Sequence, residues 1–418
     1  MWNKLRNDRK NYFILLLIAC MISGLFISRA LLSAAIIVFV IASFFHNSPA
    51  KQIKIFFSSP LLWAMSLLFF LPFISGLWSS NLHEWSSIIR IKLPLFFLPL
   101  AFASPVLNFS KFQWRGVFIL LILLVTASSL WSFANYFTNM QAINEGYLRA
   151  QTIRTPLEND HVRFSLLVAV SILISVVFLI KFKGFLKWQK IALALIALWL
   201  IVYLHLLAAR TGLLCFYAMV VVATAWMIGK QKIGWRSLIL LSGIIILPVL
   251  SWFIFPTFQN RVHYFLYEFS FFKNAQYLPG SNDGVRLLSI KAGWHVMKAA
   301  PAGVGFGDIM QETGNWYHAF YPQMLDTDKI YPASEWMIYG AGTGWIGLVL
   351  FLFAMAVPFF LSKFNCYLSW ILLNLSAVIS FMFDIGLEVQ LGVFLYAFII
   401  LWFYTGIRNG FFQQRVDK

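Results

Sequence analysis

Long apolar runs broken by short polar stretches dominate the hydrophobic pattern of this chain of 418 residues. A transmembrane α-helix needs about 20 mostly apolar residues, and the runs lack the short alternating segments of an outer-membrane barrel. We therefore predict an all-α polytopic membrane protein with about twelve spans. The spans lie near residues 11–28, 30–46, 60–78, 92–105, 116–137, 164–181, 189–207, 211–229, 237–255, 343–362, 366–384 and 389–406.

Two external segments interrupt this pattern, at 138–163 and 256–342, and the second is by far the longer. We expect both to be periplasmic loops of a single integral membrane domain that covers residues 1–418. Within the second loop, residues 284–300 predict an amphipathic helix that Ser281, Asn282 or Asp283 caps and Pro301 ends. Its apolar stripe would consist of Leu287, Ile290, Trp294 and Met297. Such a helix can lie at the membrane surface or pack over the bundle.

Basic residues predict the orientation of the spans. If the N-terminus is cytoplasmic, the cytoplasmic segments hold 19 of the 32 basic residues and only Asp8 and Asp417 of the 15 acidic ones. The other face then holds 13 of each sign (32 − 19 and 15 − 2), so the net charge of +17 lies on the cytoplasmic side. This agrees with the excess of Lys and Arg in cytoplasmic loops. The 19 are Lys4, Arg6, Arg9, Lys10, Lys51, Lys54, Lys111, Arg115, Lys181, Lys183, Lys187, Lys190, Lys230, Lys232, Arg236, Lys363, Arg408, Arg415 and Lys418.

Composition agrees with this class and excludes several others. Hydrophobic residues make up 61% of the chain and charged residues 11%, whereas soluble domains contain about 25% charged residues. The three cysteines lie in or beside apolar runs, which indicates neither a disulfide framework nor a zinc site. External histidines and carboxylates lack metal-ligand spacing, so we expect no metal and no cofactor. The orientation explains the basic pI of 9.8 without a nucleic-acid partner.

Arg210 lies in the middle of an apolar stretch from residue 191 to 227. Such a stretch would form roughly 55 Å of helix, which is too long for one span. We therefore predict two helices joined by a tight external turn at Arg210-Thr-Gly. That turn places the guanidinium at the outer interface instead of in hydrocarbon, where an unpaired arginine costs roughly 3 kcal/mol.

Other cations also mark the outer ends of predicted helices, namely Arg90, Lys92, Arg163 and Arg286. Taken singly, each could be an interfacial anchor that extends to lipid headgroups. The planar guanidinium also suits bidentate contact with phosphate. A cluster of Arg90, Arg163, Arg210 and Arg286 would therefore hold a pyrophosphate at headgroup depth.

Candidate proton acceptors lie in the same external segments. His161 precedes Arg163 at a helix entrance, His318 lies in the long loop, and Glu335 opens the tenth predicted span. The alternative for Glu335 is that its carboxylate complements the dipole at a helix N-terminus. Asp384 and Glu388 flank the last external turn and could offset the arginine charges.

Several motifs resemble those of a known family. They are KLPLFFLPLAF (92–102), NDHVRFSLLVAV (159–170), ARTGLLCFY (209–217), RLLSIKAGWHVMKAAPAGVGFGD (286–308) and YPASEWMIYGAGTGWIGLVLF (331–351). In their order and spacing, the chain is similar to the O-antigen ligase and polymerase-like superfamily of bacterial inner-membrane glycosyltransferases.

The resemblance implies a metal-independent, multi-pass transferase of the bacterial inner membrane, with both termini cytoplasmic. Its donor would be a glycan on undecaprenyl pyrophosphate, and its acceptor another glycan, a lipid A core or a protein, with membrane lipids as neighbours. Arg210 matches the Arg-Thr-Gly position of the family, and Arg286 matches the arginine that opens the loop helix.

One position departs from the family pattern. The family usually has a Pro-His-Asn-like motif where this chain reads Pro332-Ala333-Ser334-Glu335, so Ala333 stands in place of the histidine. Glu335 or a displaced histidine such as His318 would then be the base. Two alternatives to a transferase remain open: a transporter or flippase for lipid-linked oligosaccharides, and a non-catalytic assembly protein.

The predicted orientation can be tested with reporter fusions along the chain. Fusions at residues 185 and 234 should report the cytoplasm, and fusions at residues 150 and 310 should report the periplasm, because the positive loops stay inside. A cytoplasmic signal at residue 310 would contradict the orientation, since every candidate site residue would then face the wrong compartment.

Overall fold

A computed structural model describes residues 2–46, 48–157, 160–182, 184–230, 234–274 and 276–412. Every regular element within these ranges is a helix, which confirms the all-α class. The helices are α1 (Trp2–Ile27), α2 (Arg29–Phe44), α3 (Pro49–Ser58), α4 (Pro60–Ser75), α5 (Leu82–Lys92), α6 (Pro94–Phe102), α7 (Lys111–Thr138), α8 (Met140–Gly146), η1 (Tyr147–Arg149), α9 (His161–Lys181), α10 (Lys187–Leu207), α11 (Arg210–Gly229), α12 (Trp235–Ile254), α13 (Pro256–Lys273), α14 (Asp283–Ala299), α15 (Ile309–Phe320), η2 (Asp326–Asp328), α16 (Glu335–Phe360), α17 (Leu368–Phe383), η3 (Gly386–Glu388) and α18 (Gln390–Arg408).

Nine helices in the described part of the chain are long and apolar enough to cross a membrane, or ten if the bent pair α2 and α3 counts as one span. The predicted segments 30–46, 60–78 and 366–384 form α2, α4 and α17, which have 16 residues each. Such a helix is about 24 Å long, which is shorter than the hydrocarbon core of about 30 Å. The integral membrane class therefore holds, while the count of twelve spans stays a prediction.

Four of the basic residues that predict the orientation lie outside the described residues, namely Lys183, Lys232, Arg415 and Lys418. The side chains of Lys4, Arg6, Arg9 and Arg236 are likewise outside the description. The assignment of the two faces to cytoplasm and periplasm stays a prediction.

The core of the bundle is built around α9 and α18. Both are mostly buried, and α18 contacts α6, α7, α9 and α17. Near one end of α18, Trp114 and Trp402 each donate an indole N–H to the backbone carbonyl of the other, at 2.8 and 3.2 Å. By contrast, α12 presents exposed apolar side chains such as Ile245 and Phe253 along most of its length, as expected of a helix that faces lipid.

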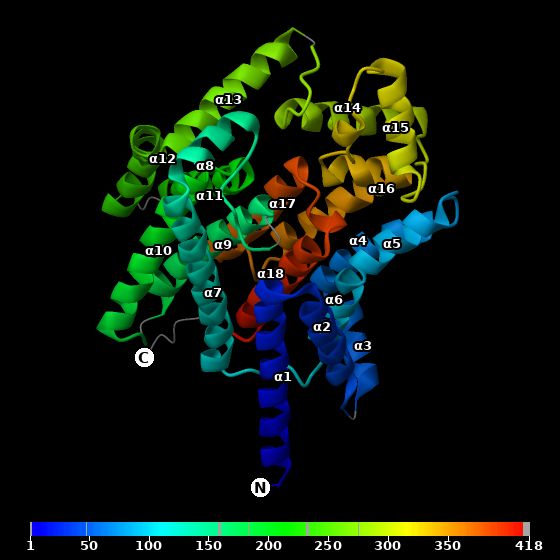
Figure 1. Cartoon of the computed structure of the whole chain (residues 1–418). Coiled ribbons are helices and arrows are strands. Elements are labelled where there is room, and N and C mark those ends of the chain that lie inside the picture. The colour runs from blue at the N-terminus through cyan, green and yellow to red at the C-terminus, as the bar shows by residue number, and fades with distance from the viewer. Residues whose placement is uncertain are drawn as a thin grey trace.

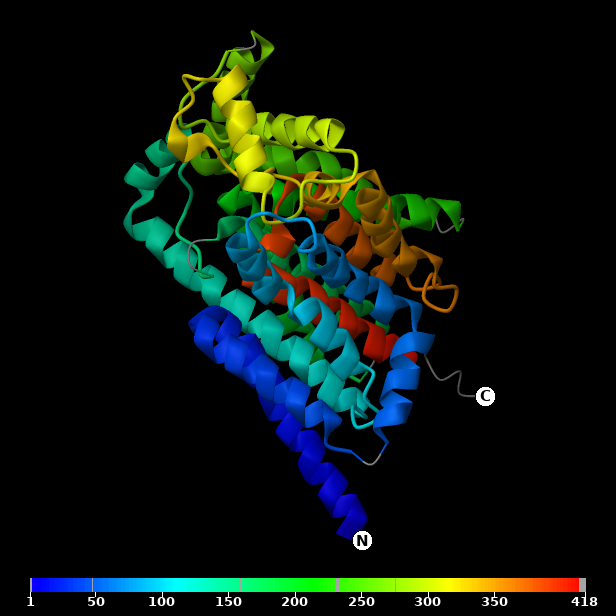
Figure 2. The ribbon, with the colours of Figure 1, turned by 90° about the vertical axis from the view of Figure 1, so that its right-hand side faces the viewer.

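Four helices form a cap at the end of the bundle opposite the N-terminus, namely α8, α13, α14 and α15 (Figures 1 and 2). Within the cap, α14 packs on α16 through small residues, since a side chain on Gly293 would press on Met337 and Pro332. The buried face of α14 is therefore centred on Leu288, Ala292 and Val296. It is offset from the expected stripe, of which Trp294 remains 40% exposed.

The hairpin between α10 and α11 turns at a different place from the one expected. Ala208 adopts a left-handed conformation with φ of 48°, and Arg210 is already the first residue of α11. Gly212 lies inside α11, where a Cβ would collide with Ser165 of α9. The glycine of the Arg-Thr-Gly motif therefore allows two helices to pack closely, and it does not form the turn.

A break at Gly344 divides α16 into two helical parts, because this residue has φ of 71° and ψ of −167°. The break removes the helical partners of two carbonyl groups, and a glycine-rich loop supplies replacements. Residues 301–305 run beside residues 341–345, and we call this contact the glycine seam. Its backbone hydrogen bonds are Val304 N to Ala341 O (2.9 Å), Gly305 N to Gly342 O (3.0 Å) and Trp345 N to Pro301 O (3.1 Å).

Only glycine fits at Gly344, because its φ is in the left-handed region and a Cβ would overlap the Pro301 carbonyl oxygen. We expect Gly344→Ala to lower the free energy of unfolding by more than about 1–2 kcal/mol, the cost of that backbone conformation alone. The measurement is the thermal unfolding midpoint of the purified protein in detergent.

Gly116 of α7 provides the matched control, because it is exposed and a Cβ there would meet no atom within 4 Å. Gly116→Ala should leave the midpoint unchanged or raise it, since alanine favours a helix over glycine by about 1 kcal/mol. Equal midpoints for the two variants would contradict the requirement for glycine at position 344 of the seam.

Candidate functional site

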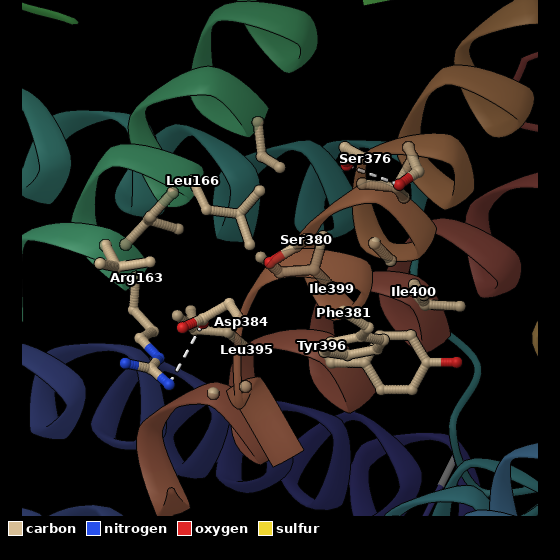
Figure 3. Close-up of a pocket in the computed structure, with 17 residues that line it drawn as sticks. Arg163, Leu166, Ser376, Ser380, Phe381, Asp384, Leu395, Tyr396, Ile399 and Ile400 are labelled. Carbon is tan, nitrogen blue, oxygen red and sulfur yellow. Dashed lines mark hydrogen bonds and ion pairs between the residues drawn. The ribbon is translucent and has the colours of Figure 1, made fainter. Parts of the chain in front are cut away.

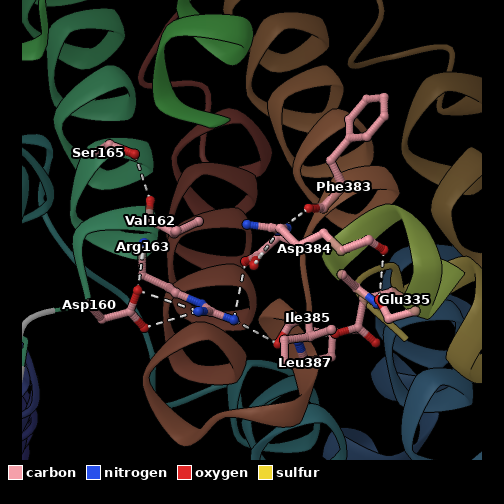
Figure 4. A network of polar contacts seen from close by, with 12 residues as sticks. Asp160, Val162, Arg163, Ser165, Glu335, Phe383, Asp384, Ile385 and Leu387 are labelled. Atoms are coloured by element: carbon pink, nitrogen blue, oxygen red, sulfur yellow. Dashed lines mark hydrogen bonds and ion pairs between the residues drawn. The ribbon is translucent and has the colours of Figure 1, made fainter. Parts of the chain in front are cut away.

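Polar side chains from four helices converge on the turn between α17 and α18, which comprises residues 384–388. Arg163 comes from the start of α9, Arg286 from α14, Glu335 from the start of α16 and Lys92 from the end of α5. These helices are far apart in the sequence, yet each sends one ionisable group to the same short segment. Figure 4 shows Arg163 and Glu335 beside this turn. The 384–388 turn is thus a polar centre at the cap end of the bundle.

The two arginines share a single carboxylate at this turn. Arg163 Nη2 lies 3.2 Å from Asp384 Oδ2 and donates to the Ile385 carbonyl at 2.9 Å. Arg286 Nη2 lies 3.5 Å from Asp384 Oδ1 and donates to the Phe383 carbonyl. Asp160 adds a second carboxylate to Arg163 at 3.2 Å. The side chain of Asp384 is only 5% exposed, so burial leaves it dependent on these cations.

The far end of the turn is held by a buried ion pair. Lys92 Nζ lies 2.6 Å from Glu388 Oε1 and donates to the Leu387 carbonyl at 3.0 Å. Its side chain is completely buried and also lies over the ring of Tyr339, 5.1 Å from its centroid. Glu335, also fully buried, accepts a hydrogen bond from the Leu387 amide through Oε1, while its Oε2 has no hydrogen-bond partner.

A second cluster surrounds Arg210, beneath the cap. Arg210 forms an ion pair with Asp283, lies 3.8 Å from Glu268 and packs its guanidinium over the ring of Phe265 at 5.2 Å. Arg261 and Arg286 lie nearby. Two carboxylates and an aromatic ring thus surround the Arg210 guanidinium, and it lies in a cluster of arginines.

Arg261 belongs to this cluster, although the sequence analysis did not select it. The residue is 5% exposed, and its Nε and Nη1 atoms are buried without a hydrogen-bond partner. Burial lowers the pKa of Arg261, while the nearby Tyr147 and Glu268 act in the opposite direction. A buried guanidinium with unused donors is unfavourable unless an anion satisfies it. Only its buried position on α13, within the cap, reveals this, because its sequence context is an ordinary polar stretch.

An apolar cavity ends at the first cluster. It has about 580 Å³ of empty space, including its open mouth, and lies between α9, α17 and α18. Leu166, Phe381 and Ile399 line its apolar part, whereas Arg163 and Asp384 lie at one end (Figure 3). The cavity therefore combines a hydrocarbon-like interior with an ionic terminus.

The remaining candidates from the sequence lie in different surroundings. His161 begins α9 two residues before Arg163 and is half-buried. His318 is exposed on α15, and its ring lies 3.4 Å from Lys329 Nζ. Arg90 is exposed and bonds to Ser86 and Ser87 of its own helix, so it does not contact the 384–388 turn. The buried cation at the end of α5 is Lys92.

Ala333, in the position of the usual family histidine, is 5% exposed, and its amide donates to Ser289 Oγ of α14 at 3.0 Å. The segment before α16 is thus bonded to α14 at this position. Among the described residues, no group of three or more His, Cys, Asp or Glu side chains could hold a metal ion.

The Lys92–Glu388 pair gives a direct test of the 384–388 turn. Lys92→Met leaves Glu388 buried without its cation, and removing one partner of a buried pair costs about 3–5 kcal/mol. We expect a strongly lowered thermal midpoint in detergent. Arg90→Met, two residues away on the exposed side, should change stability by less than about 0.5 kcal/mol.

A second substitution separates the ion pair from simple loss of packing. In Lys92→Met/Glu388→Gln the buried negative charge is gone, so the midpoint should recover part of the loss. If Lys92→Met behaves like Arg90→Met, the turn does not depend on the buried pair.

Comparison with known proteins supports the assignment that the motifs indicated. A family model described as O-antigen ligase matches residues 193–352, which run from α10 into α16 and include Arg210, Arg261, Arg286 and Glu335. No curated protein matches the chain. The family works in ligase- or polymerase-type steps of polysaccharide assembly, with lipid-linked glycans and acceptors as partners. The resemblance seen in the motifs is confirmed, since residues 193–352 are similar to the O-antigen ligase family.

Proposed function

We propose that this protein transfers a glycan from an undecaprenyl-pyrophosphate donor to an acceptor at the periplasmic face of the bacterial inner membrane. The proposal places twelve spans in the membrane and the segments 138–163 and 256–342 in the periplasm. The acceptor is another glycan if the protein is a polymerase, and a lipid A core or a protein if it is a ligase.

The apolar cavity that ends at Arg163 is the observation that carries this proposal. A polyprenyl pyrophosphate is an amphiphile with a long hydrocarbon chain and an anionic head. The cavity between α9, α17 and α18 offers apolar side chains to such a chain. Cations gather at and above its ionic end, namely Arg163, Arg286, Arg210 and Arg261. This arrangement matches the donor in having an apolar part and an anion-binding end.

In the proposed reaction, the acceptor hydroxyl attacks the anomeric carbon and the bond from that carbon to the pyrophosphate oxygen breaks. Negative charge then develops on the leaving pyrophosphate, where guanidinium donors stabilise it. Arg261 contributes unused donors to that charge, and Arg210 contributes a planar fork whose orientation the Phe265 ring restricts. The arginines supply the charge neutralisation for which other transferases use a metal ion.

A base must take the proton of the acceptor hydroxyl, and it must be within hydrogen-bond reach of that group. Glu335 is completely buried and bonded to the Leu387 amide, so it positions the 384–388 turn. His318 lies beside Lys329 on the exposed surface of the cap. His161 is half-buried at the entrance of α9, two residues from Arg163, and we assign the proton acceptor to it.

Substitution of Arg210 tests the role of the guanidinium fork. Arg210→Lys keeps the charge but loses the bidentate geometry. Loss of a charge-assisted hydrogen bond at a buried phosphate costs on the order of 1.5–3 kcal/mol, or roughly a 10- to 150-fold loss of transfer. The measurement is glycan transfer normalised to the amount of protein in the membrane.

Arg90→Lys is the matched control and should transfer at the wild-type rate, because Arg90 contacts only its own helix. If Arg210 is merely an interfacial anchor, the pattern reverses: Arg210→Lys transfers normally and Arg210→Ala only lowers the protein level. Wild-type transfer by Arg210→Lys would leave Arg163, Arg261 and Arg286 to hold the pyrophosphate.

A further inference from the structure

A second pocket lies within the cap, and Glu268 lies between this pocket and Arg210. We call it the cap pocket, and it has about 480 Å³ of empty space, including its open mouth. Its polar, charged and aromatic lining residues are Glu268, Phe271, Gln276, Tyr277, Ser281, Lys291 and Tyr321.

The lining of the cap pocket combines ring faces with hydrogen-bonding groups of both kinds. Phe271, Tyr277 and Tyr321 contribute aromatic rings, and Gln276 contributes an amide that both donates and accepts. The hydroxyl of Ser281 is buried without a hydrogen-bond partner, and the residue is 6% exposed. A buried hydroxyl without a partner is unfavourable, so a ligand with a polar atom at this position would gain a hydrogen bond to it.

The geometry of these groups is fixed by the surrounding cap. Tyr277 donates its hydroxyl hydrogen to Asp328 and accepts a hydrogen bond from the Leu325 amide at 3.2 Å. Burial and the Asp328 carboxylate raise the pKa of Tyr277 to about 12, so the phenol stays neutral. Asp328 also accepts from the Gly280 amide at 2.7 Å, which anchors the segment that carries Gln276 and Ser281.

The charged groups of the lining have opposite signs. Glu268 lies in the wall and accepts from the backbone amides of Asn282 and Asp283, and Lys291 also lines the pocket. A hydrocarbon chain would leave the buried Ser281 hydroxyl without a partner. A sugar ring has an apolar C–H face for an aromatic ring and hydroxyls that can bond to the polar groups.

Glu268 connects this pocket to the pyrophosphate cluster. Its Oε2 lies 3.8 Å from Arg210 Nη2, while its side chain lines the cap pocket. A group bound in the cap pocket is therefore a near neighbour of a group bound by Arg210. In a lipid-linked glycan, the neighbour of the pyrophosphate is a sugar.

We propose that the cap pocket binds the sugar residue of the donor glycan that lies next to the pyrophosphate. This inference rests on the proposed function for the identity of the donor. The sugar ring stacks on Tyr321, its hydroxyls bond to Ser281 and Gln276, and Glu268 separates the sugar from the arginines. The pocket thereby selects donors that carry a glycan over the bare lipid.

Two lipids distinguish this site from the pyrophosphate site. The first is bare undecaprenyl pyrophosphate, and the second is the lipid-linked glycan purified from a strain that lacks the protein. The dissociation constant of each is measured with the purified full-length protein in detergent. In the wild-type protein, the glycan-bearing lipid should bind more tightly.

Tyr321→Leu should weaken binding of the glycan-bearing lipid roughly 2- to 12-fold, the usual contribution of one aromatic stacking contact, and leave binding of the bare lipid unchanged. Phe320→Leu is the matched control, because this neighbouring aromatic is 59% exposed and does not line the pocket. Gln276→Trp, in the exposed segment, provides an independent test by filling the pocket. It should reduce the affinity for the glycan-bearing lipid to that for the bare lipid.

The outcomes separate the two proposals. Equal binding of the two lipids by the wild-type protein overturns the assignment of the cap pocket, and so does unchanged selectivity in both Tyr321→Leu and Gln276→Trp. A wild-type protein that binds neither lipid overturns the proposed donor, and the sugar assignment with it.

Discussion

The pairing of buried charges at the 384–388 turn organises the cap end of this protein. Lys92, Arg163, Arg286 and Glu335 arrive from four different helices, and each contacts the turn through a side-chain or backbone group. Removing one partner leaves an uncompensated charge in a medium that solvates it poorly, so the contacts are mutually dependent. The turn thereby fixes the relative positions of α5, α9, α14 and α16, which is a condition for holding a substrate among them.

The glycine seam complements this electrostatic centre with backbone contacts. Because Gly344 breaks α16, the first part of that helix can change direction, and the loop 301–305 satisfies the carbonyls that the break exposes. The same loop continues to Asp308, whose carboxylate accepts from the Ser80 and Asn81 amides between α4 and α5. One glycine-rich segment thus links the broken helix to the helix that carries Lys92. Its Phe306 and Gly307 amides also donate to the hydroxyls of Ser75 and Ser79.

The sequence predicted those features that depend on local composition. Apolar runs identified the helices, and the length of the apolar stretch around Arg210 indicated a boundary between two helices there. The identity of the buried cation at α5 could not be obtained in this way. Arg90 and Lys92 are two positions apart, about 200° around a helix, so only the packing of α5 decides which one enters the protein. Arg261 was missed for a similar reason, since its burial arises from contacts with distant segments. The turn expected at Arg210-Thr-Gly was misplaced because glycine serves close packing as well as turning.

Asp384 carries a further consequence for how firmly the outer cluster can hold any anion. Arg163 and Arg286 already share this carboxylate, so an incoming anion competes with a tethered one for the same donors. The tethered group has a high effective concentration, since it needs no diffusion to return. The competition therefore limits the affinity for the anion, and Asp384 re-forms its ion pairs with the two arginines as soon as the anion departs. For a site that must release its product after every turnover, such an internal competitor sets the balance between capture and release.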